Sequence, residues 1–265
     1  MKDRQALFRR FAPYRDFGRR ISLKKIRLLN VLACALLLCG AAQAQAAKVA
    51  VDTAARVLPC TTYLIATYDE KGRPDAAVID RAGIAETASG NNMIFYISVV
   101  PTRQTAKNIE ASGAFTVNVM NAGVVGKGDY CGEVSAASDG GYFDKFAVTG
   151  LKIEKSETVN APVLTECPVT LECRLLGTRD FDGGRHRMYL GEVLGYRLEA
   201  AAPEGDKTKG AEQYDPVKSN AVVYFAGSAE HSGYYKLSAP YGRSGAMYRR
   251  KYPDGGGLEP KPSGK

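Results

Sequence analysis

Residues 98–109, Ser-Val-Val-Pro-Thr-Arg-Gln-Thr-Ala-Lys-Asn-Ile, follow the apolar run at residues 93–97 and gather polar side chains around one chain reversal. The apolar run predicts a strand that ends before Pro101. Residues 103–112 have a helical composition, with Thr102 placed to cap the helix and Gly113 placed to end it. The stretch therefore predicts a strand that turns directly into a short helix.

This reversal has the chemistry of an anion site. The first turn of a helix offers free backbone N–H groups and the positive end of the helix dipole. Arg103 and Thr105 lie in that turn and Ser98 lies at the end of the preceding strand, so a guanidinium and two hydroxyls are added to it. The pattern predicts a site for a phosphate monoester. In the alternative interpretation, Thr102 and Thr105 only cap the helix and Arg103 lies on the surface.

The rest of the chain reads mainly as strands. Residues 69–72 predict a turn between two of them, and residues 121–141, rich in Gly, Ser and Asp, predict a long loop of the kind that usually carries function. Helices are few and short, which favours an antiparallel barrel over a doubly wound parallel sheet. The expected strands cover residues 61–68, 74–84, 93–99, 114–120, two or more segments within 161–176 and 188–199, and 222–226.

The net charge of +8 is concentrated at the N terminus. Residues 1–46 hold ten of the 36 basic residues but only two of the 28 acidic ones, so the remaining chain carries 26 of each and predicts no nucleic-acid partner. This basic segment precedes an apolar stretch, residues 28–40, and then an Ala-Gln-Ala-Gln-Ala-Ala sequence, which together describe a cleavable export signal. Cleavage is expected after Ala44 or Ala46.

The route and outcome of export have alternatives. Residues 18–24, Gly-Arg-Arg-Ile-Ser-Leu-Lys, partly resemble the twin-arginine signal, with Ser22 where that signal prefers Phe. Residues 28–47 carry no charge, so an uncleaved membrane anchor is the second interpretation, because about 20 residues can span a bilayer. The protein is therefore expected to be periplasmic, or membrane-anchored if the signal is retained. Beyond this segment no contact with the membrane is expected.

Metal and nucleophile motifs are missing from the sequence. The chain has no His-Glu-x-x-His or Gly-x-Ser-x-Gly motif, and its only histidines are His186 and His231. The cysteine spacing supports no zinc site, and no metal is expected. Cys167 and Cys173 would lie about 20 Å apart on one strand, beyond disulfide reach, so they are expected to be thiols.

Six motifs in a fixed order resemble the flavin reductase-like proteins, a family that includes flavoredoxin. The resemblance covers roughly residues 59–199, and more weakly residues 214–248. Its marks are Thr-Tyr-Asp-Glu-Lys-Gly-Arg-Pro-Asp-Ala-Ala-Val at 67–78, the reversal at 98–109 with Phe-Thr-Val-Asn-Val after it, and the segments at 128–135, 144–151, 160–173 and 183–193. The resemblance implies an FMN-binding split β-barrel that is mainly β, antiparallel and Greek-key-like, with a few short helices.

The family also implies roles for particular residues. The reversal would bind the phosphate of FMN through Ser98, Arg103 and Thr105. The strand after the first turn, residues 78–82, would contact the flavin ring, which brings in Val78, Asp80, Arg81 and Ala82. Lys145 falls in a loop near the flavin and the partner subunit, and His186 occupies the position of the family's active-site histidine. In the alternative interpretation His186 makes a structural hydrogen bond.

Two departures from the family bear on the flavin. Many relatives carry a Trp after the first hairpin, whereas this chain has residues 80–82 there and contains no Trp. Arg81 is expected either to cover the ring or to hold its reduced, anionic form by charge. Asp75 stands where an Asn is common.

The tyrosines of the C-terminal part are expected to pack or to form a dimer contact: Tyr224, Tyr234, Tyr235, Tyr241 and Tyr248.

The prediction of the barrel domain and of the function follows from the resemblance, whereas the linker and the tail follow from their polar and Gly/Pro/Lys-rich composition. Residues 47–200 are expected to form the FMN-binding domain and 201–220 a polar linker. Residues 221–250 are expected to form an extension packing on the barrel or a dimer partner, and residues 251–265 a flexible tail.

The predicted protein is a homodimer that holds FMN non-covalently and passes two electrons to an unknown acceptor. NAD(P)H is one candidate donor, but it is scarce outside the cytoplasm, so a periplasmic or membrane electron carrier is the other. The alternatives are an electron carrier without its own substrate and a binding module that has lost FMN.

Overall fold

The structure is a computed structural model that describes residues 48–51, 58–86, 92–138, 141–199, 214–227 and 230–238. The chain divides into two units, Met1–Thr53 and Ala54–Lys265, and the second carries the fold. The expected export signal, most of the linker and the tail lie outside the described residues and stay predictions. Within the described ranges, no helix has the length and apolar character that a membrane span requires.

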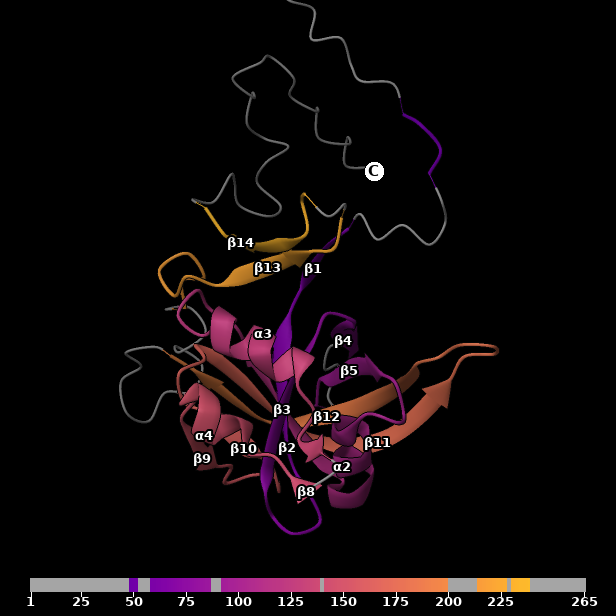
Figure 1. Ribbon diagram of the computed structural model, residues 1–265, viewed down its shortest axis with the longest axis vertical. Helices are drawn as coiled ribbons and strands as arrows, with labels where there is room; N and C mark the ends of the chain where they lie inside the picture. The colour runs from indigo at the N-terminus through magenta and orange to yellow at the C-terminus, as the bar shows by residue number, and fades with distance from the viewer. Residues whose placement is uncertain are drawn as a thin grey trace, which may run out of the picture. The chain divides into compact units, whose positions relative to one another are not determined.

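Seven antiparallel strands form the main sheet, in the order β3-β2-β6-β11-β12-β5-β4 (Figure 1). They are β2 (Tyr63–Tyr68), β3 (Pro74–Ile79), β4 (Ala82–Glu86), β5 (Ile94–Val99), β6 (Ala114–Val119), β11 (Val169–Asp180) and β12 (Arg187–Leu198). The two edge strands, β3 and β4, are consecutive in the chain and only Asp80 and Arg81 separate them. So short a link requires the two edges to lie close together, and the sheet therefore curls into a barrel with a seam between β3 and β4.

Shorter elements cover the barrel. The described helices are α2 (Gln104–Ser112), α3 (Val125–Glu133) and α4 (Lys145–Thr149). The remaining strands are β1 (Pro59–Thr61), β7 (Ala137–Ser138), β8 (Gly141–Tyr142), β9 (Ile153–Lys155), β10 (Pro162–Leu164), β13 (Val222–Phe225) and β14 (Gly233–Lys236). The predicted class, a mainly β antiparallel barrel with a few short helices, is confirmed.

Local chemistry places the turns and the end of α2. The Asp69 side chain accepts hydrogen bonds from the backbone N–H groups of Lys71 and Arg73, at 2.9 and 2.8 Å, and this closes the hairpin between β2 and β3. Gly113 ends α2 in the left-handed conformation, with φ 69°, and donates its backbone N–H to the Ile109 carbonyl. The expected cap at Thr102 is wrong, because the N-cap residue is Arg103 and no side chain caps this helix.

The main sheet separates two buried clusters. Ile65 and Val117 point into the barrel interior with Phe95 and Phe115, while Leu64 packs on the opposite face in the cluster that includes Met120 and Phe146. Strands β2 and β6 are consequently buried on both faces. The polar side chains of β6 are satisfied within this packing: the Asn118 amide donates to the Leu64 carbonyl at 3.0 Å, and the Thr116 hydroxyl donates to the Pro162 carbonyl at 2.5 Å.

The expected loop at residues 121–141 contains α3, so the prediction of irregular structure is wrong over residues 125–133. Three glycines weaken the local signal for this helix, because glycine has a low helix propensity. Two of them have a packing reason. A Cβ at Gly128 would lie 2.6 Å from the Met120 sulfur, and one at Gly132 would lie 3.2 Å from the Val78 Cβ. The helix is thus stabilised by close packing on the sheet.

The C-terminal extension packs on the barrel. Strand β13 pairs with β1 and β14, and the Asn121–Ala221 bridge joins its start to the end of β6. The rings of Tyr224 and Tyr234 lie 5.1 Å apart, and the Tyr234 hydroxyl donates to Asp129 of α3 at 2.8 Å. These contacts give the two tyrosines a packing role. Tyr241 and Tyr248 lie outside the described residues.

Candidate functional site

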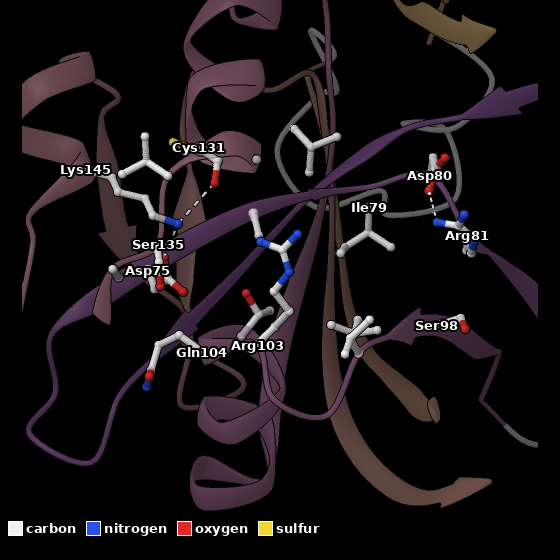
Figure 2. Close-up of a pocket in the computed structure, with 18 of the residues that line it drawn as sticks. Asp75, Ile79, Asp80, Arg81, Ser98, Arg103, Gln104, Cys131, Ser135 and Lys145 are labelled. Carbon is white, nitrogen blue, oxygen red and sulfur yellow. Dashed lines mark hydrogen bonds and ion pairs between the residues drawn. The ribbon is translucent and has the colours of Figure 1, made fainter. Parts of the chain in front are cut away.

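A pocket lies at the seam of the barrel, beside the N terminus of α2 (Figure 2). Its empty space, including the part open to solvent, is about 650 Å³. Figure 2 shows Arg103 and Gln104 rising from the start of α2 at its centre. Asp75, Lys145, Cys131 and Ser135 line one side, and Ile79, Asp80, Arg81 and Ser98 line the other.

The start of α2 has an unused capacity to bind an anion. The helix has no side-chain cap and no acidic residue in its first turn. The Arg103 guanidinium lines the pocket and has no hydrogen-bond or ion-pair partner among the residues that the structure describes. Free helix N–H groups beside an unpaired guanidinium are the donors that a phosphate or carboxylate requires. The alternative in which Thr102 and Thr105 cap the helix therefore loses its support.

Residues at the seam between β3 and β4 line the other side of the pocket. The Ser98 backbone N–H donates to the Arg81 carbonyl at 2.8 Å, which holds β5 against the corner between β3 and β4. The Arg81 guanidinium pairs with the neighbouring Asp80 carboxylate at 3.0 Å, and the Arg81 side chain is 43% exposed. Arg81 thus lies at the pocket with its charge already shared with a carboxylate.

The hairpin of β11 and β12 brings His186 to the pocket. His186 immediately precedes β12, and it lines the pocket although most of the hairpin tip is exposed. Arg187 next to it pairs with Asp180 across the hairpin at 2.8 Å and with Glu110 of α2 at 3.0 Å. The Tyr189 hydroxyl donates to the same Glu110 oxygen at 2.7 Å. This cluster ties the hairpin to α2 and so fixes where His186 lies.

Lys145 and Asp75 form a buried ion pair, with 3% and 2% of their side chains exposed and 2.8 Å between Nζ and Oδ1. Strand β3 supplies Asp75. Asp144 caps α4 by accepting the backbone N–H groups of Phe146 and Ala147, and so places Lys145 in the first turn of that helix. Burial raises the pKa of Asp75, although Lys145 opposes this effect. Burial also raises the pKa of the Cys131 thiol, to about 11, so it stays protonated near neutrality.

The pocket brings together most of the residues that the sequence predicts for it: Val78, Asp80, Arg81, Ser98, Arg103, Thr105, Lys145 and His186. Ala82 is not among the lining residues, because it begins β4 beyond the corner and packs against the barrel interior. Lys145 lines the pocket, but its ammonium is enclosed by protein groups.

Sequence reasoning missed Gln104, Cys131 and Ser135 as lining residues, and it left the effect of Asp75 open. Gln104 had a signal in the sequence, since it stands between two residues assigned to the phosphate. Among the described residues, no group of three or more His, Cys, Asp or Glu side chains is arranged to hold a metal ion.

Comparisons with known proteins agree with this architecture. A protein from Aeropyrum pernix without an assigned role is 27% identical over 146 residues, 55% of this chain; the match spans only about half, 52%, of that relative. Flavoredoxin of Desulfovibrio vulgaris (Miyazaki F) superposes with a TM-score of 0.62 at 23% identity, over 76% of this chain and 98% of its own. The FMN-binding protein from Thermus thermophilus, solved with bound 1-cyclohex-2-enone, superposes with a TM-score of 0.54 at 18% identity, over 74% and 99%.

The structural likenesses show the fold, which is that of the flavin reductase-like, FMN-binding split barrels. The family model described as the flavin reductase like domain matches residues 55–229, well over half of the chain and nearly all of the described strands. The resemblance read from the six motifs is thereby confirmed, and the chain belongs to the flavin reductase like domain family.

Proposed function

We propose that this protein binds FMN non-covalently in the seam pocket and passes two electrons through it to an acceptor. The observation that carries the proposal is the uncapped start of α2 beside the unpaired Arg103 guanidinium. These donors suit the phosphate, while Val78 and Ile79 and the peptide groups of the seam suit the flat faces of a ring system.

Different residues of the pocket are proposed to bind the phosphate and the ring of FMN. Arg103, Thr105 and Ser98 would hold the phosphate, and Arg81 would lie near the ring, where its charge favours an anionic form. Bound FMN supplies the redox chemistry, and the protein positions and tunes it. Family membership supports an oxidoreductase. The flavoredoxin and FMN-binding protein among the similar structures support a flavin as the cofactor.

The cellular location, the electron donor and the oligomeric state are part of the same proposal. The basic N-terminal segment supports export to the periplasm, where NAD(P)H is scarce, so a protein or small-molecule electron carrier is proposed as donor beside NAD(P)H. A homodimer is proposed because the family's flavin sites lie near a subunit interface. These features are supported by the sequence and the resemblance alone.

A spectrum of the purified protein tests the proposal. We expect protein from the exporting host to be yellow and to show flavin absorbance that is released on denaturation. Colourless protein that does not bind added FMN would identify a barrel that has lost its cofactor. Anaerobic addition of NADPH then separates two roles: bleaching indicates a nicotinamide-dependent reductase, and unchanged absorbance that dithionite bleaches indicates an electron carrier.

His186→Ala is expected to slow electron transfer more than it weakens FMN binding, because the resemblance gives His186 the position of the family's active-site histidine and the residue lines the pocket. Stopped-flow reduction and reoxidation rates, compared with the FMN dissociation constant, measure the difference. His231→Ala is the matched control, since it removes the only other histidine from an exposed position outside the pocket lining. Equal rates in the two variants would assign His186 a structural role.

A further inference from the structure

The carboxylate of Asp75 lies between two hollows. It lines the seam pocket, and it also lines a second pocket with Gln104, Asn108 and Tyr142. The residue is 1% exposed, yet within the described part of the chain neither carboxylate oxygen accepts a well-aligned hydrogen bond. The ion pair with Lys145 is its main compensation, and the Ala76 backbone N–H and the Thr105 hydroxyl add smaller ones. An incompletely satisfied buried carboxylate is costly, so its protonation state responds strongly to its surroundings.

Lys145 has no donor left for a ligand. An ammonium group carries three N–H donors. The Lys145 ammonium contacts the Ala76 carbonyl at 2.8 Å, the Cys131 carbonyl at 3.1 Å and the Asp75 carboxylate at 2.8 Å. Lys145 can therefore affect an anion in the pocket through its charge only, and that charge is cancelled while Asp75 is ionised.

The charges that line the pocket do not match a phosphate monoester. The cations are Arg81, Arg103 and Lys145, and the carboxylates are Asp75 and Asp80. Asp80 pairs with Arg81 and Asp75 pairs with Lys145, which leaves the charge of Arg103 alone. A phosphate monoester carries about −1.5 to −2 charges near neutral pH. One more positive charge would be needed to balance it.

We propose that Asp75 is the proton-accepting group of this pocket, so that binding of a flavin phosphate is coupled to the uptake of one proton by the Asp75 carboxylate. This inference rests on the proposed FMN site. Protonation removes one negative charge and leaves the Lys145 charge uncompensated, which gives the lining a second net positive charge. Thr105 links the two groups: it lines the phosphate side of the pocket, and its hydroxyl lies close enough to Asp75 to lower the pKa of the carboxyl.

Apart from His186, the other groups that face Asp75 do not offer the same response. Lys145 approaches from α4, Cys131 from α3 and Tyr142 from β8, while Asp69 and Arg73 face it from the hairpin across the second pocket. The pKa values of Cys131 and Tyr142 are raised to about 11 and about 12, so both stay protonated near neutrality. Asp69 and Arg73 pair with each other at 2.7 Å. Arg103 and His186 line the same pocket, and His186 is the second group whose proton uptake must be separated experimentally.

The unmodified protein provides the first test. FMN and riboflavin, which lacks the phosphate, are titrated into the apoprotein by calorimetry at about pH 8, where the free phosphate is mainly a dianion. Buffers of different ionisation enthalpy report the protons taken up. We expect uptake approaching one proton for FMN and little for riboflavin. The FMN affinity should fall by up to tenfold per pH unit wherever Asp75 is ionised in the apoprotein, because the proton must then come from solvent.

Two carboxylate variants locate the proton. Asp75→Asn should abolish the uptake, flatten the pH dependence and raise FMN affinity at about pH 8. Asp80→Asn removes the same charge from the same pocket, at a partly exposed carboxylate that pairs with Arg81, and it leaves Asp75 in place, so it should lessen the uptake without abolishing it. Circular dichroism establishes that each variant is folded. If Asp75→Asn does not fold, the comparison of FMN with riboflavin still decides whether the phosphate recruits a proton.

The outcomes separate this inference from the proposed function. FMN binding with no proton uptake, or with uptake that persists in Asp75→Asn, overturns the role of Asp75 and leaves the FMN site standing. Uptake that is lost in His186→Gln instead assigns the proton to the histidine and likewise overturns it. Absence of FMN binding at every pH overturns the proposed function and this inference together.

Discussion

Arg103→Ala is expected to weaken FMN binding by about 1.5 to 3 kcal/mol, roughly ten- to 150-fold in the dissociation constant. The guanidinium lines the pocket next to the uncapped start of α2 and has no partner among the described residues, so it is free to make a charge-assisted bond to the phosphate. Its removal should leave folding unaffected, because the side chain is exposed. Quenching of flavin fluorescence on binding measures the affinity.

Lys107→Ala is the matched control for Arg103→Ala. Lys107 is exposed on the same helix, one turn further along, and it does not line the pocket. A purely long-range effect of charge would weaken FMN binding in both variants, whereas a direct phosphate contact affects only Arg103. Riboflavin adds a second control, since its affinity should be the same in all three proteins. Unchanged FMN affinity in Arg103→Ala would place the guanidinium on the surface and remove the main support for the phosphate site.

Elements with local chemical causes were predicted well from the sequence. The helix expected at residues 103–112 begins one residue later, at Gln104, and Gly113 ends it as predicted. The turn at residues 69–72 is fixed by the Asp69 side chain and by Gly72, which has φ 73°. In both cases a short polar side chain or a glycine decides the conformation within four residues, and a single sequence contains that information.

Features that depend on distant parts of the chain were not predicted. Residues 74–84 were expected to form one strand, but the chain turns at Asp80 and Arg81 so that β3 and β4 occupy opposite edges of the sheet. The turn follows from closure of the barrel, which no local pattern encodes. Helix α3 is a second case, because its glycines reduce helix propensity and its formation depends on packing against Val78 and Met120.

The candidate site was predicted mainly through the family resemblance. Ser98, Arg103 and Thr105 have an independent basis in the chemistry of a helix N terminus, and the pocket brings them together. Ala82 is assigned to the flavin ring by the resemblance, as part of the strand after the first turn. That strand ends at Ile79, and beyond the corner Ala82 packs against the barrel interior. The pairing of Asp75 with Lys145 joins residues 70 positions apart and required the structure.

Lys145→Met is expected to destabilise the protein by about 3 to 5 kcal/mol at neutral pH, because it leaves the buried Asp75 carboxylate without its counter-ion. The Ala76 and Cys131 carbonyls lose their donor in the same step. Burial already raises the pKa of Asp75, and loss of Lys145 should raise it further. A carboxyl with a raised folded-state pKa contributes stability that is lost as pH rises through that value. The difference from the unmodified protein should therefore shrink as pH falls.

Lys127→Met on α3 is the matched control. Lys127 pairs with Glu166 at the same 2.8 Å, but 32% and 28% of the two side chains are exposed, so this ion pair should contribute at most about 1 kcal/mol. Urea unfolding of the unmodified protein and both variants, at about pH 7 and again about two units lower, gives the comparison. If Lys145→Met costs no more than Lys127→Met at neutral pH, then Asp75 is protonated in the folded protein even beside Lys145. In that case no free carboxylate remains to accept a proton when a phosphate binds.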